Sequence, residues 1–254
     1  MSEDIDALRI KAEQGDAEAQ FDLGSCYFNG KGVPQDYGKG IEWWRKSAAQ
    51  GNVGAQGNLG VCYASGRGVA QDYGKAVDWY TKAANQGDAF AQNKLGLCYL
   101  QGLGVAQDSE KALDWCTRAA EQGDADAQFF VGWFYSEGKN YEKAFEWWKK
   151  AAEQGHSGAQ SNIGMCYRNG LGVANDYVKA SEWYRKAAEQ GDVNAQFMLG
   201  NCYRQGKGVP QDFDQAIQWF KKAAEQGDSN AHKMIGLCEQ IRKGYHVFDS
   251  LLGK

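Results

Sequence analysis

The chain has 254 residues, a formal net charge of -4 and a pI of about 5.5. This acidic balance argues against a nucleic-acid or anionic-membrane surface, because both need clustered positive charge. No apolar run approaches the roughly 18 residues that a membrane-spanning helix needs, and the acidic start at residues 1–6 lacks the apolar stretch of a signal peptide. We therefore expect a cytoplasmic protein, with a secreted or periplasmic one as the alternative if a leader has been removed.

The sequence repeats itself every 36 residues. Three successive Cys-Tyr pairs, at residues 26–27, 62–63 and 98–99, follow this interval. One later interval, from Tyr135 to Tyr167, is 32 residues, because the loop around residues 138–141 is four residues shorter than its equivalents. A deletion confined to a loop is what a packed helical repeat tolerates. Self-similarity at this period predicts a solenoid, in which stacked units share one core.

We predict a single solenoid over residues 1–254. Residues 1–15 end in Lys-Ala-Glu-Gln-Gly, like the second helix of a repeat, and are expected to form an N-terminal half-repeat. The last segment, which leaves the pattern, is predicted to be a terminal helix and a divergent C-terminal cap, the alternative being a tail that docks in a groove. The predicted units are 1–15, 16–51, 52–87, 88–123, 124–155, 156–191, 192–227 and 228–254.

Each repeat contains two predicted helices, A and B, with helical rather than alternating apolar spacing. Helix A follows an Asp or Asn, such as Asp16 or Asn52, that can accept hydrogen bonds from the first backbone N–H groups, and it stops at a glycine such as Gly30. Helix B follows a second aspartate, such as Asp36. A glycine recurs inside helix A (Gly24 in the first repeat) although it costs about 1 kcal/mol relative to alanine. This recurrence predicts a neighbouring helix that crosses too closely for a methyl group.

One tryptophan per repeat recurs in helix B, and we expect this column to fill the core between hairpins. Acid–base pairs four residues apart, such as Asp114 and Arg118, fit the exposed face of the same helix. The tryptophan column consists of Trp43, Trp79, Trp115, Trp147, Trp183 and Trp219.

Cysteines and histidines do not form a recognisable chemical site. Six of the seven cysteines occupy one column, and packed helices lie about 8–10 Å apart, too far for disulfides between equivalent positions. We expect buried free thiols, which agrees with a reducing compartment. The three histidines fall in unrelated positions, and the Gly-x-Gly-Val loops follow helices rather than strands, which excludes a dinucleotide site. We predict no catalytic residues, no metal and no cofactor.

The repeated residues resemble the Sel-1-like repeat family, which is related to the tetratricopeptide repeats. The resemblance depends on Ala-x-Ala-Gln-x-x-Leu-Gly, Gly-x-Gly-Val, Lys-Ala-x-x-Trp and Lys-Ala-Ala-x-Gln-Gly, found in nearly every copy over about residues 5 to 240. It implies an all-α fold, a right-handed α/α superhelical solenoid of antiparallel helix pairs, and a scaffold or adaptor role, often in bacteria. The chain departs from the pattern at Gly40, at Cys116, which replaces an aromatic residue, and at the short loop.

By resemblance to tetratricopeptide repeats, helix A lines the concave wall of the solenoid. Several of its non-packing positions are apolar, which suggests that a partner covers them, and the arginines could pair with a carboxylate and fix the register of a bound peptide. The alternative is that some of these side chains pack between adjacent helices A. The candidate groove residues are Phe21, Phe28, Phe90, Asn93, Leu97, Phe129, Trp133, Met165, Arg168, Phe197, Asn201 and Arg204.

The function that these observations favour is a protein-interaction scaffold that binds a protein or peptide partner, with no nucleic acid and no membrane as partner. A self-assembling structural protein is one alternative. A weak β-lactamase-like hydrolase is another, because some cysteine-rich relatives have been described as such, but the chain has no Ser-x-x-Lys motif. No oligomeric state follows from the sequence, and a monomer is compatible with it.

Overall fold

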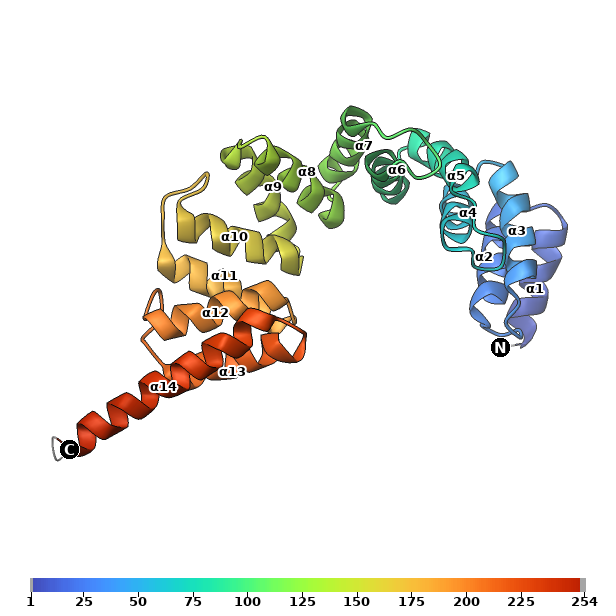
Figure 1. Ribbon diagram of the computed structural model, residues 1–254. Coiled ribbons are helices and arrows are strands. Elements are labelled where there is room, and N and C mark those ends of the chain that lie inside the picture. The colour runs from blue at the N-terminus through green and yellow to red at the C-terminus, as the bar shows by residue number, and fades with distance from the viewer. Residues whose placement is uncertain (1, 252–254) are drawn as a thin grey trace. The chain divides into compact units, whose positions relative to one another are not determined.

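The computed structural model describes the backbone of residues 2–251 and the side chains of residues 5–243, and within this range it consists of fourteen α-helices and no strand (Figure 1). The prediction of an all-α fold of sequential helix pairs is confirmed. The helices are α1 (Ser2–Glu13), α2 (Ala17–Asn29), α3 (Tyr37–Ala49), α4 (Val53–Ser65), α5 (Tyr73–Asn85), α6 (Ala89–Gln101), α7 (Ser109–Glu121), α8 (Ala125–Glu137), α9 (Tyr141–Glu153), α10 (Ser157–Asn169), α11 (Tyr177–Glu189), α12 (Val193–Gln205), α13 (Phe213–Glu225) and α14 (Ser229–Leu251).

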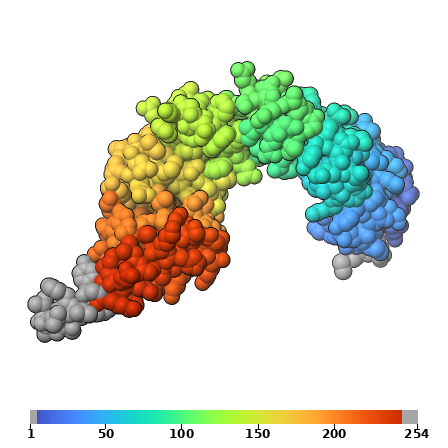
Figure 2. Space-filling model, in the orientation of Figure 1, coloured from blue at the N-terminus to red at the C-terminus, as the bar shows by residue number. Residues whose placement is uncertain are grey.

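The helices form two compact units, residues 1–127 and residues 128–254. In the first unit α2 pairs with α3, α4 with α5 and α6 with α7, and each pair packs against the next. In the second unit the same arrangement continues from α9 to α14. Within each unit successive pairs lie side by side without a gap (Figure 2). Within each unit, consecutive helices therefore bury their apolar faces against one another.

The helix ends lie where the capping residues predicted them. The Asp16 carboxylate accepts a hydrogen bond from the Ala19 N–H at 2.7 Å, and Asp36 does the same for Lys39 at 3.0 Å. Gly30 ends α2 in the left-handed conformation with φ of 69°, which a residue without Cβ adopts at no steric cost. His156 replaces the usual cap in front of α10, and its Nδ1 accepts from the Ala159 N–H at 3.1 Å.

The recurrence of a glycine inside helix A has the predicted cause. A Cβ built on Gly60 would lie 2.5 Å from the ring of Tyr80 in α5, and one on Gly164 would lie 2.7 Å from Tyr184 in α11. Gly236, the equivalent position in α14, has nothing within 4 Å, because α14 is the last helix that the structure describes. The close approach thus exists wherever a helix B follows.

The tryptophan column packs against the core, as predicted, but lines its edge rather than filling its centre. Its half-buried members that contact the buried clusters are Trp43, Trp79, Trp115, Trp183 and Trp219. In the first repeat the core position is the next residue, Trp44, which is 3% exposed, while Trp43 is half-buried. The Lys46 ammonium lies 4.1 Å from the centre of the Trp43 ring and covers its outer face. Neighbouring residues on a helix point about 100° apart, so only one of the two can face helix A.

The same arrangement recurs in every copy. The core position next to each tryptophan is filled by Trp44, Tyr80, Cys116, Trp148, Tyr184 and Phe220, which are all buried. A lysine or arginine covers each half-buried tryptophan, in the pairs Lys46–Trp43, Lys82–Trp79, Arg118–Trp115, Lys150–Trp147, Lys186–Trp183 and Lys222–Trp219. Of the predicted acid–base pairs, Asp114 and Arg118 do form an ion pair at 3.0 Å.

A buried glutamine in each repeat connects three consecutive helices. Gln56 of α4 donates to the carbonyl of Ala48 in α3 at 3.2 Å and accepts from the side chain of Gln86, at the end of α5, at 2.8 Å. Gln56 is 5% exposed, so its bond to the Ala48 carbonyl is shielded from water, whereas the bond from the exposed Gln86 is shielded only in part. The donor–acceptor pairs are Gln50–Gln20, Gln86–Gln56, Gln122–Gln92, Gln154–Gln128, Gln190–Gln160 and Gln226–Gln196. This ladder explains the invariant glutamine of the Ala-x-Ala-Gln motif in residues 17–196.

The short loop and the C-terminal segment depart from the repeat. Lys139, between α8 and α9, has φ of 59° and is the non-glycine residue that adopts the left-handed conformation in the described backbone. The predicted cap at the C-terminus continues α14 as helix as far as Leu251. The side chains beyond residue 243 lie outside the described residues, so the capping role of this segment stays a prediction.

Candidate protein-binding surface

In the first unit, the predicted groove residues differ in how far they are open to solvent. Phe90 in α6 is 43% exposed, and the Lys94 ammonium lies 5.1 Å from the centre of its ring. Phe21 is half-buried, since a Cβ on Gly54 of the next helix A would touch its ring at 3.1 Å. Phe28 packs on the Trp44 ring at 4.6 Å between centroids. Leu97, in α6, is half-buried.

Asn93 is used inside the fold. Its side chain is 2% exposed and donates to the Asp124 carboxylate, the cap of α8, at 2.9 Å. Its backbone and side-chain oxygens also face the buried thiol of Cys116 at 4.0 and 3.9 Å. The residue therefore has no surface to offer a partner, although its position in helix A is equivalent to that of Phe21.

In the second unit, Trp133 of α8 is 41% exposed and lies 5.7 Å from the Phe130 ring. Phe129 stacks on the His156 ring at 4.5 Å and packs against the core of α9 and α10. Phe197 packs on Phe220 at 5.4 Å. Phe129 and Phe197 therefore fill space between helices, as the alternative interpretation of these aromatics expected.

The remaining groove residues are half-buried and lie on two helices. They are Met165 and Arg168 on α10 and Asn201 and Arg204 on α12. Arg204 donates from Nε and Nη2 to the Asn201 Oδ1 at 3.3 and 3.2 Å. One Arg168 nitrogen lies 2.9 Å from the Met198 sulfur. The helix A face of this unit is thus aromatic at α8 and cationic at α10 and α12.

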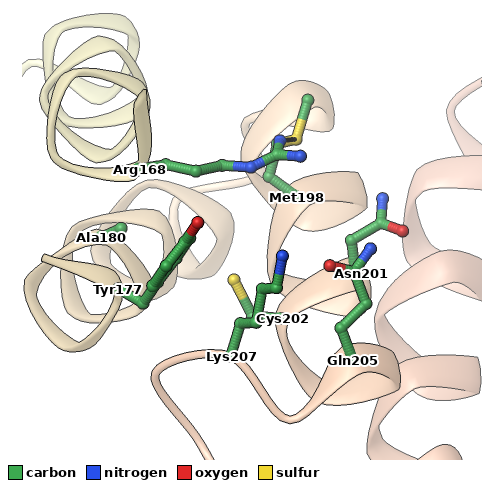
Figure 3. Close-up of a pocket in the computed structure, with 8 residues that line it drawn as sticks. All are labelled: Arg168, Tyr177, Ala180, Met198, Asn201, Cys202, Gln205 and Lys207. Atoms are coloured by element: carbon green, nitrogen blue, oxygen red, sulfur yellow. Dashed lines mark hydrogen bonds between the residues drawn. The ribbon is translucent and has the colours of Figure 1, made fainter. Parts of the chain in front are cut away.

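A pocket opens beside Arg168 (Figure 3). It is shallow, with about 10 Å³ of enclosed space, room for one water-sized group, and its lining comes from α10, α11, α12 and the loop after α12. Lys207 of this loop lies 5.1 Å from the centre of the Tyr177 ring, which is 38% exposed. Sequence reasoning missed Tyr177 and Lys207, because neither belongs to helix A. The sequence indicated only part of this site, through the lysine of the Gly-Lys-Gly-Val loop.

The positive charges beside this pocket affect the pKa values of the buried groups around it. Burial raises the pKa of the Cys202 thiol, and the charges of Arg168 and Lys207 oppose that shift. Burial also raises the pKa of the Tyr184 hydroxyl to about 12, again against the effect of Arg168. Both cations are therefore close to the wall of the pocket rather than extended into solvent.

The cysteines are free, and six of the seven are buried. Burial raises the pKa of Cys62 to about 11 and that of Cys166 to about 12, so these thiols stay protonated at neutral pH. The described residues contain no group of three His, Cys, Asp or Glu side chains placed to hold a metal ion. Among the described helices, none is both long and apolar enough to cross a lipid bilayer.

Comparison with protein families identifies the repeat. The Sel1 repeat matches residues 17–52, 53–88, 89–124, 125–156, 157–192 and 193–228. The chain belongs to the Sel1 repeat family. The resemblance inferred from the sequence is thereby confirmed. Proteins built from Sel1 repeats generally act as protein-interaction scaffolds, and the solenoid that these repeats form is typically non-catalytic.

Solved structures of Sel1 repeat proteins resemble this chain over most of its length. A protective antigen of uropathogenic Escherichia coli with an SLR fold is 41% identical, with a TM-score of 0.87 over 92% of this chain and 51% of the antigen. A Sel1 repeat protein from Oxalobacter formigenes is 36% identical, with a TM-score of 0.77 over 85% of this chain and 86% of its own. The present chain thus spans about half the length of the antigen. A comparison with curated proteins gave no match.

Proposed function

We propose that this Sel1 repeat protein is a scaffold that binds a peptide or protein partner on its helix A face. The observation that carries the proposal is the exposure of Phe90 and Trp133, at 43% and 41%. The other phenylalanines of the predicted groove pack against the core clusters; they are Phe21, Phe28, Phe129 and Phe197. Covering an aromatic side chain of this size is worth about 1.5–3 kcal/mol. Each of these two rings is therefore an anchor for an apolar side chain of a partner.

The positions that surround the anchors support specific recognition. Small or polar residues (Glu18, Gly54, Asp126) stand at the position equivalent to Phe90 in other repeats. The position equivalent to Trp133 varies between the polar residues Ser25 and Asn201 and the smaller apolar residues Val61, Leu97 and Met165. Because the repeats share one backbone, this variation changes the surface without changing the core. Of the predicted groove residues, this proposal includes those that are exposed or half-buried. It excludes Asn93, which is buried.

Peptide selection tests the proposal. Peptides would be selected from a random library on the immobilised protein, and their affinities measured by calorimetry for the wild type and for the single variants Phe90→Ser and Trp133→Ser. We expect at least about a tenfold loss of affinity for one of the variants, which corresponds to 1.4 kcal/mol, with little change in melting temperature. Val178→Ser, which removes an apolar side chain that is 56% exposed on helix B, is the matched control. Equal binding by all four proteins would contradict the proposal.

We also propose a bacterial origin and a reducing compartment, the cytoplasm. The relatives at 41% and 36% identity come from bacteria, and buried free thiols with raised pKa values suit a reducing environment. Fractionation of the source cells with an antibody against the chain tests this, and recovery in the periplasm or medium would contradict it.

A further inference from the structure

The pocket beside Arg168 concentrates positive charge that the rest of the fold does not neutralise. Helices α10 and α12 contain no Asp or Glu, although the chain has 32 acidic residues. Both helices instead carry an arginine in the last turn, Arg168 and Arg204, and Lys207 follows in the loop. Cations that converge in a cleft raise the local concentration of anions.

The contacts of Arg168 are with weak, uncharged acceptors. The guanidinium lies against the Met198 sulfur and close to the Tyr184 hydroxyl. The ion pairs found among the described residues do not include Arg168, whereas the lysines of helix B cover tryptophan rings or pair with aspartates, as Lys179 does with Asp176. A half-buried guanidinium has lost part of its hydration, and a carboxylate is the partner that its planar fork fits best.

The position of the pocket selects the type of anion. Arg168 and Arg204 stand at the C-terminal ends of their helices, just before the caps Gly170 and Gly206. Helix C-termini carry partial negative charge, which opposes a doubly charged phosphate more than singly charged carboxylates. Phosphate sites also use free backbone N–H groups at helix N-termini. The helix that begins in this pocket wall, α11 with Tyr177, is already capped by the Asp176 carboxylate, which accepts from the Lys179 N–H.

We propose that an acidic peptide segment binds here, with one carboxylate in the pocket between Arg168 and Lys207 and a second on Arg204, which lies outside the pocket lining, three residues after Asn201 on α12. Asn201 lines the same pocket (Figure 3). Its Oδ1 accepts two hydrogen bonds from Arg204 and one N–H of its amide donates to the Phe197 carbonyl, which leaves the other N–H for the peptide. This proposal specifies that the part of the partner that covers α10 and α12 is acidic. It therefore depends on the proposed scaffold function.

The test uses a probe without apolar side chains. The full chain, labelled with ¹⁵N, is titrated with acetyl-(Glu)3-amide, acetyl-(Gln)3-amide or inorganic phosphate, while the Arg Nε–H and Asn side-chain signals are recorded. We expect saturable shifts of Arg168, Arg204 and Asn201 with the glutamate peptide alone, at a Kd on the order of 1 mM, that weaken as salt is added. Arg168→Gln should weaken binding about tenfold or more, and Arg168→Lys less so.

Lys221→Gln, which removes one positive charge from the exposed face of α13, is the control that should bind as the wild type does. A melting curve of each variant shows that the fold is kept. Equal shifts with the glutamine peptide, shifts with phosphate alone, or no shifts up to about 10 mM would each overturn the proposal. The glutamate peptide has no apolar side chain to bind Phe90 or Trp133, so this titration does not test the proposed scaffold function. Failure of that function would appear in the peptide selection instead, as library peptides whose affinity is unchanged by Phe90→Ser and Trp133→Ser.

Discussion

The glycines of α4 allow a direct test of how closely the two helices of a repeat cross. Gly57 and Gly60 lie one turn apart in the same helix. A Cβ on Gly57 would have nothing within 4 Å, whereas a Cβ on Gly60 would lie 2.5 Å from two carbons of the Tyr80 ring. Tyr80 is 3% exposed, so its ring has no free space to move into.

The two alanine substitutions should therefore change stability in opposite directions. Each gains about 1 kcal/mol from the higher helix propensity of alanine. At Gly60 the added methyl group approaches the ring about 1 Å closer than the usual contact distance of roughly 3.5–4.0 Å, and overpacking of a core costs about 1–3 kcal/mol. We expect Gly57→Ala to raise the free energy of unfolding by up to about 1 kcal/mol and Gly60→Ala to lower it by up to about 2 kcal/mol, the overpacking cost less the gain in helix propensity.

Urea unfolding followed by circular dichroism measures both effects. Tyr80→Ala opens the space beside Gly60, so in that background Gly60→Ala should be neutral or stabilising. If Gly60→Ala cost as much without the Tyr80 ring as with it, steric conflict between α4 and α5 would not be the reason for the glycine. A stabilising effect of Gly60→Ala in the wild type would refute the reasoning outright.

Three further predictions concern the ladder, the thiols and the short loop. Gln160→Leu should lower the free energy of unfolding by about 2 kcal/mol, because the buried Ala152 carbonyl loses its donor and the Gln190 amide loses its acceptor; Gln101→Leu, on an exposed position, should not. Burial raises the pKa of Cys166 from 9.0 to about 12, so the stability it supplies is complete below pH 9 and is lost as the pH rises towards 12. The stability gap between wild type and Cys166→Ala should then shrink by up to about 1.4 kcal/mol per pH unit above pH 9, and a constant gap in urea titrations would contradict this. Lys139→Gly should raise the melting temperature by removing left-handed strain, whereas Lys139→Val should lower it; equal melting curves would show that φ of 59° costs nothing there.

Local chemistry explains why the sequence predicted so much of this fold. A cap joins a side chain to a backbone group three residues away, as Asp16 does with Ala19, so the residue pattern alone marks where helices begin and end. The recurrence of these caps every 36 residues then fixed the number and order of the helices, and the glycine of helix A indicated a close crossing before its partner was known.

Contacts between distant residues could not be read in the same way. The choice between Trp43 and Trp44 as the core residue depends on the rotation of α3 against α2, and both residues are equally apolar. Asn93 and Phe21 occupy equivalent positions, yet only the placement of the neighbouring cap, Asp124, shows that Asn93 is buried. The sequence by itself determined the helices, their ends and their repeat. Only the tertiary structure decided which face of each helix is covered, because burial depends on the relative orientation of elements about 20–30 residues apart, and with it which side chains are left for a partner.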